Sequence, residues 1–142
     1  MVSQLLIAWS LMAVSVVIHA CGVSFSLRWL RQREMPSDRL AAWSWLFIRL
    51  AGWIVFLHVV EITTWAFTYA LMDAMPDIQS ALYFSAVTYT TTGYGDLVLP
   101  QRWRLVGAIE ALTGILMCGW STGFFFAVVS RMSAFRRGDP AA

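Results

Sequence analysis

The strongest constraint on this chain is an apolar run, Leu5–Leu27, that contains no charged side chain over 23 positions. A helix of that length crosses the roughly 30 Å hydrocarbon core of a lipid bilayer. Two further apolar runs, Leu50–Met72 and Trp103–Ser130, are of comparable length. A signal peptide is the alternative for the first run, but the four residues before it include no lysine or arginine. We therefore predict an all-α membrane protein with three transmembrane helices.

The composition agrees with a membrane protein. Hydrophobic residues make up 59% of the chain and charged residues 13%, whereas a soluble domain carries about 25% charged residues. Membrane lipid is therefore an expected partner. The basic residues are all arginines, and they lie at the flanks of the apolar runs. Because they form no continuous basic face, nucleic acid is not an expected partner.

The placement of the arginines predicts the orientation of the chain. Cytoplasmic loops of membrane proteins are enriched in basic residues. Most of the arginines lie between the first two runs or after the third: Arg28, Arg31, Arg33, Arg39, Arg131, Arg136 and Arg137. We expect both segments on the cytoplasmic side of the plasma (cell inner) membrane, with the N-terminus outside and the C-terminus cytoplasmic.

The segment between the second and third runs cannot cross a bilayer. Asp77 is a good N-cap, and a helix over residues 78–90 would be roughly 20 Å long. The loop that follows, Thr91–Gly95, is rich in threonine and glycine. Non-helical backbone at membrane depth is tolerated only when it is buried in protein or lines a water-filled cavity. We therefore predict a re-entrant pore helix and a pore-lining loop, four copies of which would stack rings of carbonyl oxygens around a cation.

The stretch from Thr91 to Asp96, TTGYGD, resembles the selectivity filter of the pore-loop potassium channel superfamily, whose pattern is Thr-Val-Gly-Tyr-Gly-Asp. The similarity covers roughly residues 50–131, with outer helix, pore helix, filter and inner helix in the family's order. The resemblance implies a homotetramer of identical subunits that conducts K⁺ passively and selectively. It places the outer mouth of the pore at Asp96. It assigns the filter to five residues, of which the first four would hold K⁺: Thr91, Thr92, Gly93, Tyr94 and Gly95.

Two positions depart from the family's pattern. Thr92 replaces an aliphatic residue, and its side chain is expected to point behind the filter. Val87 stands where many members carry a carboxylate that pairs with the aspartate after the GYG, so Asp96 must find another partner. Tyr94 matches the potassium-selective form rather than the aspartate of a non-selective relative. A non-selective monovalent cation channel of the same architecture and a non-conducting regulatory subunit are the alternatives.

Two glutamates, Glu61 and Glu110, lie inside apolar runs, where a carboxylate is costly unless it is paired or functional. In one interpretation they brace the filter through hydrogen bonds to Thr88, Tyr89 or Thr92. In the other they are paired, buried carboxylates that stabilise helix packing without contacting ions. The sequence leaves both interpretations open.

Glycines in the third run also have two interpretations. Gly114 and Gly119 are candidates for a gating hinge, because a glycine midway along the inner helix often permits bending in the family that the chain resembles. Small residues also let transmembrane helices approach closely without any hinge.

The predicted organisation has three parts. Residues 1–35 form an additional N-terminal transmembrane helix with a cytoplasmic linker, residues 36–134 the pore module, and residues 135–142 a short tail. Within the module we expect an interfacial helix before residue 50, then an outer helix (50–72), a pore helix (78–90), the filter (91–95) and an inner helix (103–130).

Neither an enzymatic activity nor a cofactor is expected. A metal site built from His58, Glu61 and Glu110 is not expected, because no second histidine is expected nearby. A haem held between His19 and His58 has no further support in the residue pattern.

Overall fold

The computed structural model describes residues 2–32 and 40–136. In this part of the chain the regular elements are all helical: α1 (Val2–Arg31), α2 (Leu40–Leu71), α3 (Ile78–Tyr89), the 3₁₀ turn η1 (Gln101–Trp103) and α4 (Arg104–Arg136). Three of the helices are long and apolar enough to cross a membrane. The prediction of an all-α membrane protein with three spans is confirmed.

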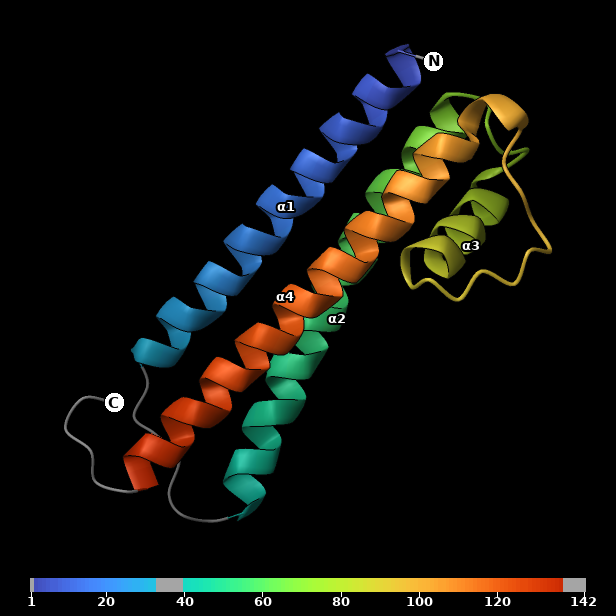
Figure 1. The fold of residues 1–142 in the computed structure, drawn as a ribbon. Coiled ribbons are helices and arrows are strands. Elements are labelled where there is room, and N and C mark those ends of the chain that lie inside the picture. Colours follow the sequence, from blue (N-terminus) through green and yellow to red (C-terminus); the bar gives the residue numbers. More distant parts are fainter. Residues whose placement is uncertain (1, 33–39, 137–142) are drawn as a thin grey trace.

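The three long helices run side by side, with α1 and α4 pointing one way and α2 the other (Figure 1). The short helix α3 packs against α2 and α4 near the end of the bundle where α1 begins (Figure 1). The C-terminal end of α1 and the N-terminal end of α2, which flank the predicted cytoplasmic linker, lie at the opposite end of the bundle (Figure 1). This arrangement keeps α3 and the loop after it within the depth spanned by the long helices.

Helix α2 is longer than the predicted outer helix. The expected interfacial segment and the expected span form one continuous helix from Leu40 to Leu71. No proline interrupts this stretch, and its single glycine costs only about 1 kcal/mol relative to alanine. The predicted boundary between linker and pore module falls outside the described residues.

The other boundaries differ by smaller amounts. The pore helix begins where predicted, because the Asp77 side chain accepts a hydrogen bond from the Ser80 N–H at 2.8 Å. This backbone hydrogen bond holds the pKa of the Asp77 carboxyl below its ordinary value. The helix ends at Tyr89, one residue earlier than expected. Helix α4 starts after η1 and continues to Arg136, beyond the predicted end at residue 130.

Helix α1 packs against α2 and α4 through one stripe of residues. The buried residues of the stripe recur every three or four positions: Ala8, Leu11, Ser15, His19, Gly22, Val23, Ser26 and Leu30. Because several of them are small, the helix backbones approach closely, as at Gly22, which lies against the Leu57 side chain. Two indole N–H groups of α2 donate hydrogen bonds to this stripe, Trp53 to the Gly22 carbonyl and Trp65 to Ser15 Oγ.

Candidate ion-conduction site

The loop after α3 has an alternating backbone. The dihedral φ is positive at Thr91 (58°), Gly93 (55°) and Gly95 (76°), that is, at every second residue. A backbone in which φ alternates in sign can turn successive peptide groups the same way, which gathers their N–H groups on one side and their carbonyls on the other. Glycine adopts positive φ at little cost, whereas Thr91 is strained by about 1–2 kcal/mol.

Hydrogen bonds to the end of α3 hold this backbone in place. The Thr91 N–H donates to the Thr88 carbonyl at 2.9 Å, and the N–H groups of Thr92 and Gly93 both donate to the Val87 carbonyl. Since these N–H groups face α3, the carbonyls of the same peptide groups face away from it. The result is a row of carbonyl oxygens on the free side of the loop, where residues 91–96 are exposed in the single chain.

The threonine that departs from the family's pattern is tied to the same helix end. Thr92 Oγ1 lies 2.9 Å from Thr90 Oγ1, and the Thr90 hydroxyl donates to the Ala86 carbonyl at 2.7 Å. The Thr92 hydroxyl is therefore the donor to Thr90. An aliphatic residue at position 92 could not make this contact, so the substitution gives the loop one more tether to α3.

Asp96 has a partner that the sequence analysis did not identify. The Tyr83 hydroxyl donates to Asp96 Oδ2 at 2.7 Å. This hydrogen bond holds the pKa of the Asp96 carboxyl below its ordinary value and raises the pKa of Tyr83. Tyr83 lies one helical turn before Val87, on the same face of α3. A tyrosine hydroxyl thus links α3 to the outer end of the loop, where the family's pattern has a carboxylate at position 87.

Glu110 of α4 is fully buried against α3 and α2. It contacts the Ser85 hydroxyl and accepts a hydrogen bond from the Tyr69 hydroxyl at 2.8 Å. Ser85 Oγ also lies 2.9 Å from the Ile62 carbonyl. A single serine hydrogen cannot serve both acceptors, so the protonated form of Glu110, donating to Ser85 Oγ, satisfies every contact. Glu110 is thus hydrogen-bonded to Ser85, which lies within α3.

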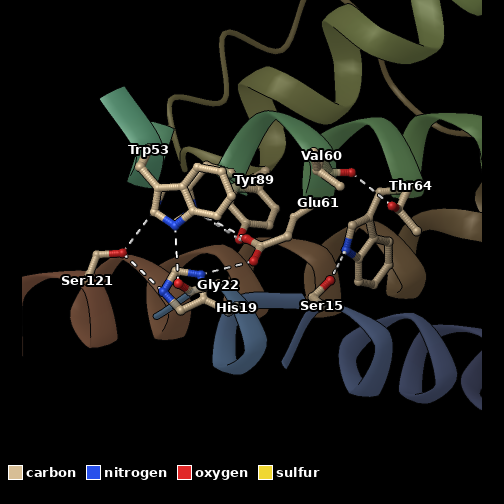
Figure 2. Close-up of polar contacts among 11 residues, drawn as sticks. Ser15, His19, Gly22, Trp53, Val60, Glu61, Thr64, Tyr89 and Ser121 are labelled. Atoms are coloured by element: carbon tan, nitrogen blue, oxygen red, sulfur yellow. Dashed lines mark hydrogen bonds and ion pairs between the residues drawn. The ribbon is translucent and has the colours of Figure 1, made fainter. Parts of the chain in front are cut away.

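Glu61 of α2 is also fully buried, and it lies in a different polar cluster. One carboxylate oxygen lies 3.0 Å from His19 Nδ1, and the other lies 3.2 Å from His58 Nδ1. The Tyr89 hydroxyl donates to the second oxygen. Ser121 of α4 closes the cluster from the opposite side, as Figure 2 shows. All four helices contribute to this cluster.

The structure places the remaining predicted site residues as follows. A Cβ atom on Gly114 would lie 1.9 Å from the Tyr89 carbonyl oxygen, whereas one on Gly119 would meet nothing within 4 Å. Gly114 therefore marks a close approach between α4 and the end of α3, and Gly119 does not. Thr88 lines a cavity of about 380 Å³ together with Phe84 and Arg104 and is not brought to either glutamate by the contacts described above. The hinge and bracing roles of these residues stay predictions.

The expectation that His58 has no second histidine nearby is wrong. His19 comes from α1, 42 positions before Glu61, and its ring lies 5.2 Å from that of His58. Glu110, in contrast, is not part of this group. Ligand-type atoms of His19, His58 and Glu61 lie within 4.8 Å of one another, and they are already engaged by hydrogen bonds. Sequence reasoning could not find this group because it depends on how α1 rotates against α2.

The fold and the site together define a membrane channel with a short helix and an anchored carbonyl loop between two spans. A family model described as ion channel matches residues 46–131, which is more than half of the chain. The chain belongs to this ion channel family, within the pore-loop channel superfamily. No curated protein and no solved structure matches the chain.

Proposed function

We propose that this protein is a potassium channel in which four identical chains surround one pore. The observation that carries the proposal is the loop at Thr91–Gly95, whose alternating φ and N–H anchors leave its carbonyls on the free side. Such backbone inside a membrane requires protein or water around it. Three further copies of the chain around a central axis would supply that cover.

Passive conduction follows from the chemistry of this loop. Rings of carbonyl oxygens replace the hydration shell of a permeant cation, and several sites in series let ions enter and leave rapidly. In the proposal K⁺ is held at Thr91, Thr92, Gly93 and Tyr94, and Asp96 adds negative charge at the outer mouth. The C-terminal end of α3 points its partial negative charge toward the same region.

The membrane placement of the proposal rests on the arginines. The N-terminus and the outer mouth would face the outside of the plasma membrane, and the linker and the C-terminus the cytoplasm. This orientation puts the filter near the outer leaflet, because α3 lies near the end of the bundle where α1 begins (Figure 1). The four chains and the surrounding lipid are the partners that the proposal requires.

The test is cation flux through the purified protein in liposomes. We expect efflux of K⁺ and Tl⁺ and little efflux of Na⁺. Gly93→Ala should abolish this selectivity, since alanine at positive φ is strained by about 1–2 kcal/mol in each of the four subunits. Gly52→Ala is the matched control, because both positions have open space for a Cβ atom and only Gly93 has positive φ.

The outcomes separate the proposal from its alternatives. Equal Na⁺ and K⁺ flux would make the protein a non-selective monovalent cation channel. Absence of any flux from liposomes that contain correctly folded protein would favour a regulatory subunit that does not conduct.

A further inference from the structure

The polar cluster around Glu61 is a closed ring of four contacts. Glu61 touches the Nδ1 atoms of His19 (3.0 Å) and His58 (3.2 Å), and Ser121 Oγ touches the Nε2 atoms of the same two rings (3.2 and 3.1 Å). His19, Glu61 and Ser121 are buried, and His58 is nearly so. Each side chain of the ring thus bonds to two others, and the ring connects α1, α2 and α4 (Figure 2).

The number of hydrogens in the ring decides its charge. Four contacts require four hydrogens. Ser121 supplies one, and a neutral imidazole supplies one each for His19 and His58. An ionised Glu61 supplies none, so three hydrogens are available for four contacts. The ring is complete only when it binds one additional proton, on an imidazole or on Glu61.

The net charge of the ring also favours the state with one additional proton. With neutral histidines and ionised Glu61 the ring carries a net charge of −1 inside a membrane span, where an uncompensated charge is costly. One added proton makes it neutral. A divalent cation in the same place would leave a net charge of +1. The hydrogen count and the charge count therefore both favour a proton as the ligand.

The ring is joined directly to the end of α3. The Tyr89 hydroxyl donates to Glu61 and lies 3.4 Å from His58 Nδ1. Tyr89 is the last residue of α3, and its carbonyl lies against Gly114. The filter loop begins two residues later at Thr91. The ring is therefore in direct contact with the last residue of the helix that precedes the filter loop.

Helix α1 contributes one member of the ring, His19, whose imidazole also makes an aromatic contact with α4. The His19 ring lies 5.5 Å from the Trp120 ring of α4. The other titratable groups that face the ring are Tyr89 from α3 and, from α4, Cys118 and the more distant Glu110. Glu110 is already engaged by Ser85 and Tyr69, and Cys118 lies on an exposed face.

We propose that the ring of His19, Glu61, His58 and Ser121 is a proton-binding site through which α1 holds the base of the filter, so that cation flux falls when the proton leaves. The flux part rests on the proposed channel function, whereas the binding of the proton does not. When the proton dissociates to water, the ring changes from neutral to −1 and one of its four contacts loses its hydrogen, so the ring that joins α1 to α2 and α4 beside Tyr89 is no longer closed.

The composition of the chain makes the proton site directly observable. The chain has two histidines, and both belong to the ring. Nitrogen-15 labelling of histidine therefore reports on the ring alone in an NMR titration from about pH 5 to about pH 9, the range around the ordinary imidazole transition. We expect the signals of both rings to change together at one midpoint. Separate midpoints, or no transition in this range, would overturn the proposal, and so would stoichiometric zinc in protein purified without chelator.

Ser121→Ala tests the hydrogen count. Without the hydroxyl, two neutral histidines can donate their Nδ1–H groups to ionised Glu61, so the remaining contacts need no additional proton and only the charge of the ring favours one. The shared transition should therefore move to lower pH. Ser26→Ala is the matched control, because Ser26 is also buried but donates only to the Gly22 carbonyl of its own helix. A shared transition that keeps its wild-type midpoint in Ser121→Ala would contradict the ring.

Flux measurements test the coupling to the filter. With the same pH on both sides of the liposome, wild-type flux should fall about fivefold or more as pH rises through the NMR midpoint. Ser121→Ala should move this dependence to lower pH together with the NMR midpoint, and Ser26→Ala should leave it unchanged. A shared NMR transition without any change in flux would refute the coupling. A wild-type protein that conducts at no pH would refute the proposed function. The NMR titration alone would then decide whether the ring binds the proton.

Discussion

Gly114→Ala tests the idea that close packing of α4 against α3 sets the position of the filter. A Cβ atom at this position would lie 1.9 Å from the Tyr89 carbonyl oxygen and 2.8 Å from its carbonyl carbon. Ordinary van der Waals contact begins at 3.4 Å, so the end of α3 would have to retreat by about 1.5 Å, which a close-packed interior resists. The obstructing atoms are backbone, and a change of rotamer cannot relieve the clash.

The magnitude follows from two opposing effects. Overpacking a well-packed site costs about 1–3 kcal/mol, and replacing glycine by alanine inside a helix returns about 1 kcal/mol. We expect the free energy of unfolding to fall by up to about 2 kcal/mol per subunit, which is up to about a 30-fold change in the ratio of folded to unfolded protein. Because Tyr89 precedes the filter, the K⁺/Na⁺ flux ratio should fall as well.

Gly119→Ala is the matched control, since no atom lies within 4 Å of the position that its Cβ would take. In detergent it should unfold at the same temperature as the wild type or at a higher one, with selectivity unchanged. If Gly114→Ala is as stable and as selective as Gly119→Ala, the packing argument is wrong. Slower opening in Gly119→Ala with normal stability would instead support the hinge interpretation of that glycine.

Three further predictions concern the contacts behind the filter. Tyr83→Phe removes the donor to Asp96, and the conducting filter should inactivate faster in single-channel records, with unchanged subunit assembly on size-exclusion chromatography. Folding lowers the pKa of Asp96, so its contribution is present at neutral pH and is lost as pH falls through the lowered value. The acid limit of flux should therefore lie at a lower pH in the wild type than in Tyr83→Phe; the same acid limit in both proteins would contradict this. Glu110→Ala leaves the Tyr69 hydroxyl buried without its partner, which should cost about 1–3 kcal/mol in thermal unfolding, whereas wild-type stability would show that the glutamate is dispensable.

The sequence predicts the conformation of the loop at Thr91–Gly95 and the start of α3 well because both signals are local. The glycines at 93 and 95 occur where positive φ is required, and the N-cap at Asp77 fixes the start of α3. Both depend on neighbours within a few positions. The three spans could be predicted from the sequence equally well, because length and apolarity suffice to identify them.

The side-chain contacts around α3 and the loop after it could be predicted only in part from the sequence. The link from Tyr83 to Asp96 could have been anticipated, since Tyr83 lies four residues before Val87 and shares its face of α3. The contact of His19 with Glu61 joins residues 42 positions apart. It depends on the rotation of α1 about its axis, and no local pattern specifies that rotation. Side chains on separate helices meet according to packing, which the sequence of either helix alone does not encode.

The reversal potential of the reconstituted protein tests the central claim most directly. With K⁺ on one side of the bilayer raised tenfold over the other and Na⁺ balancing the total, a potassium-selective pore should shift the reversal potential by about 59 mV toward the K⁺ equilibrium value. A shift near that value, abolished in Gly93→Ala and kept in Gly52→Ala, is the predicted result. A reversal potential that stays near zero as the K⁺ gradient changes would contradict potassium selectivity.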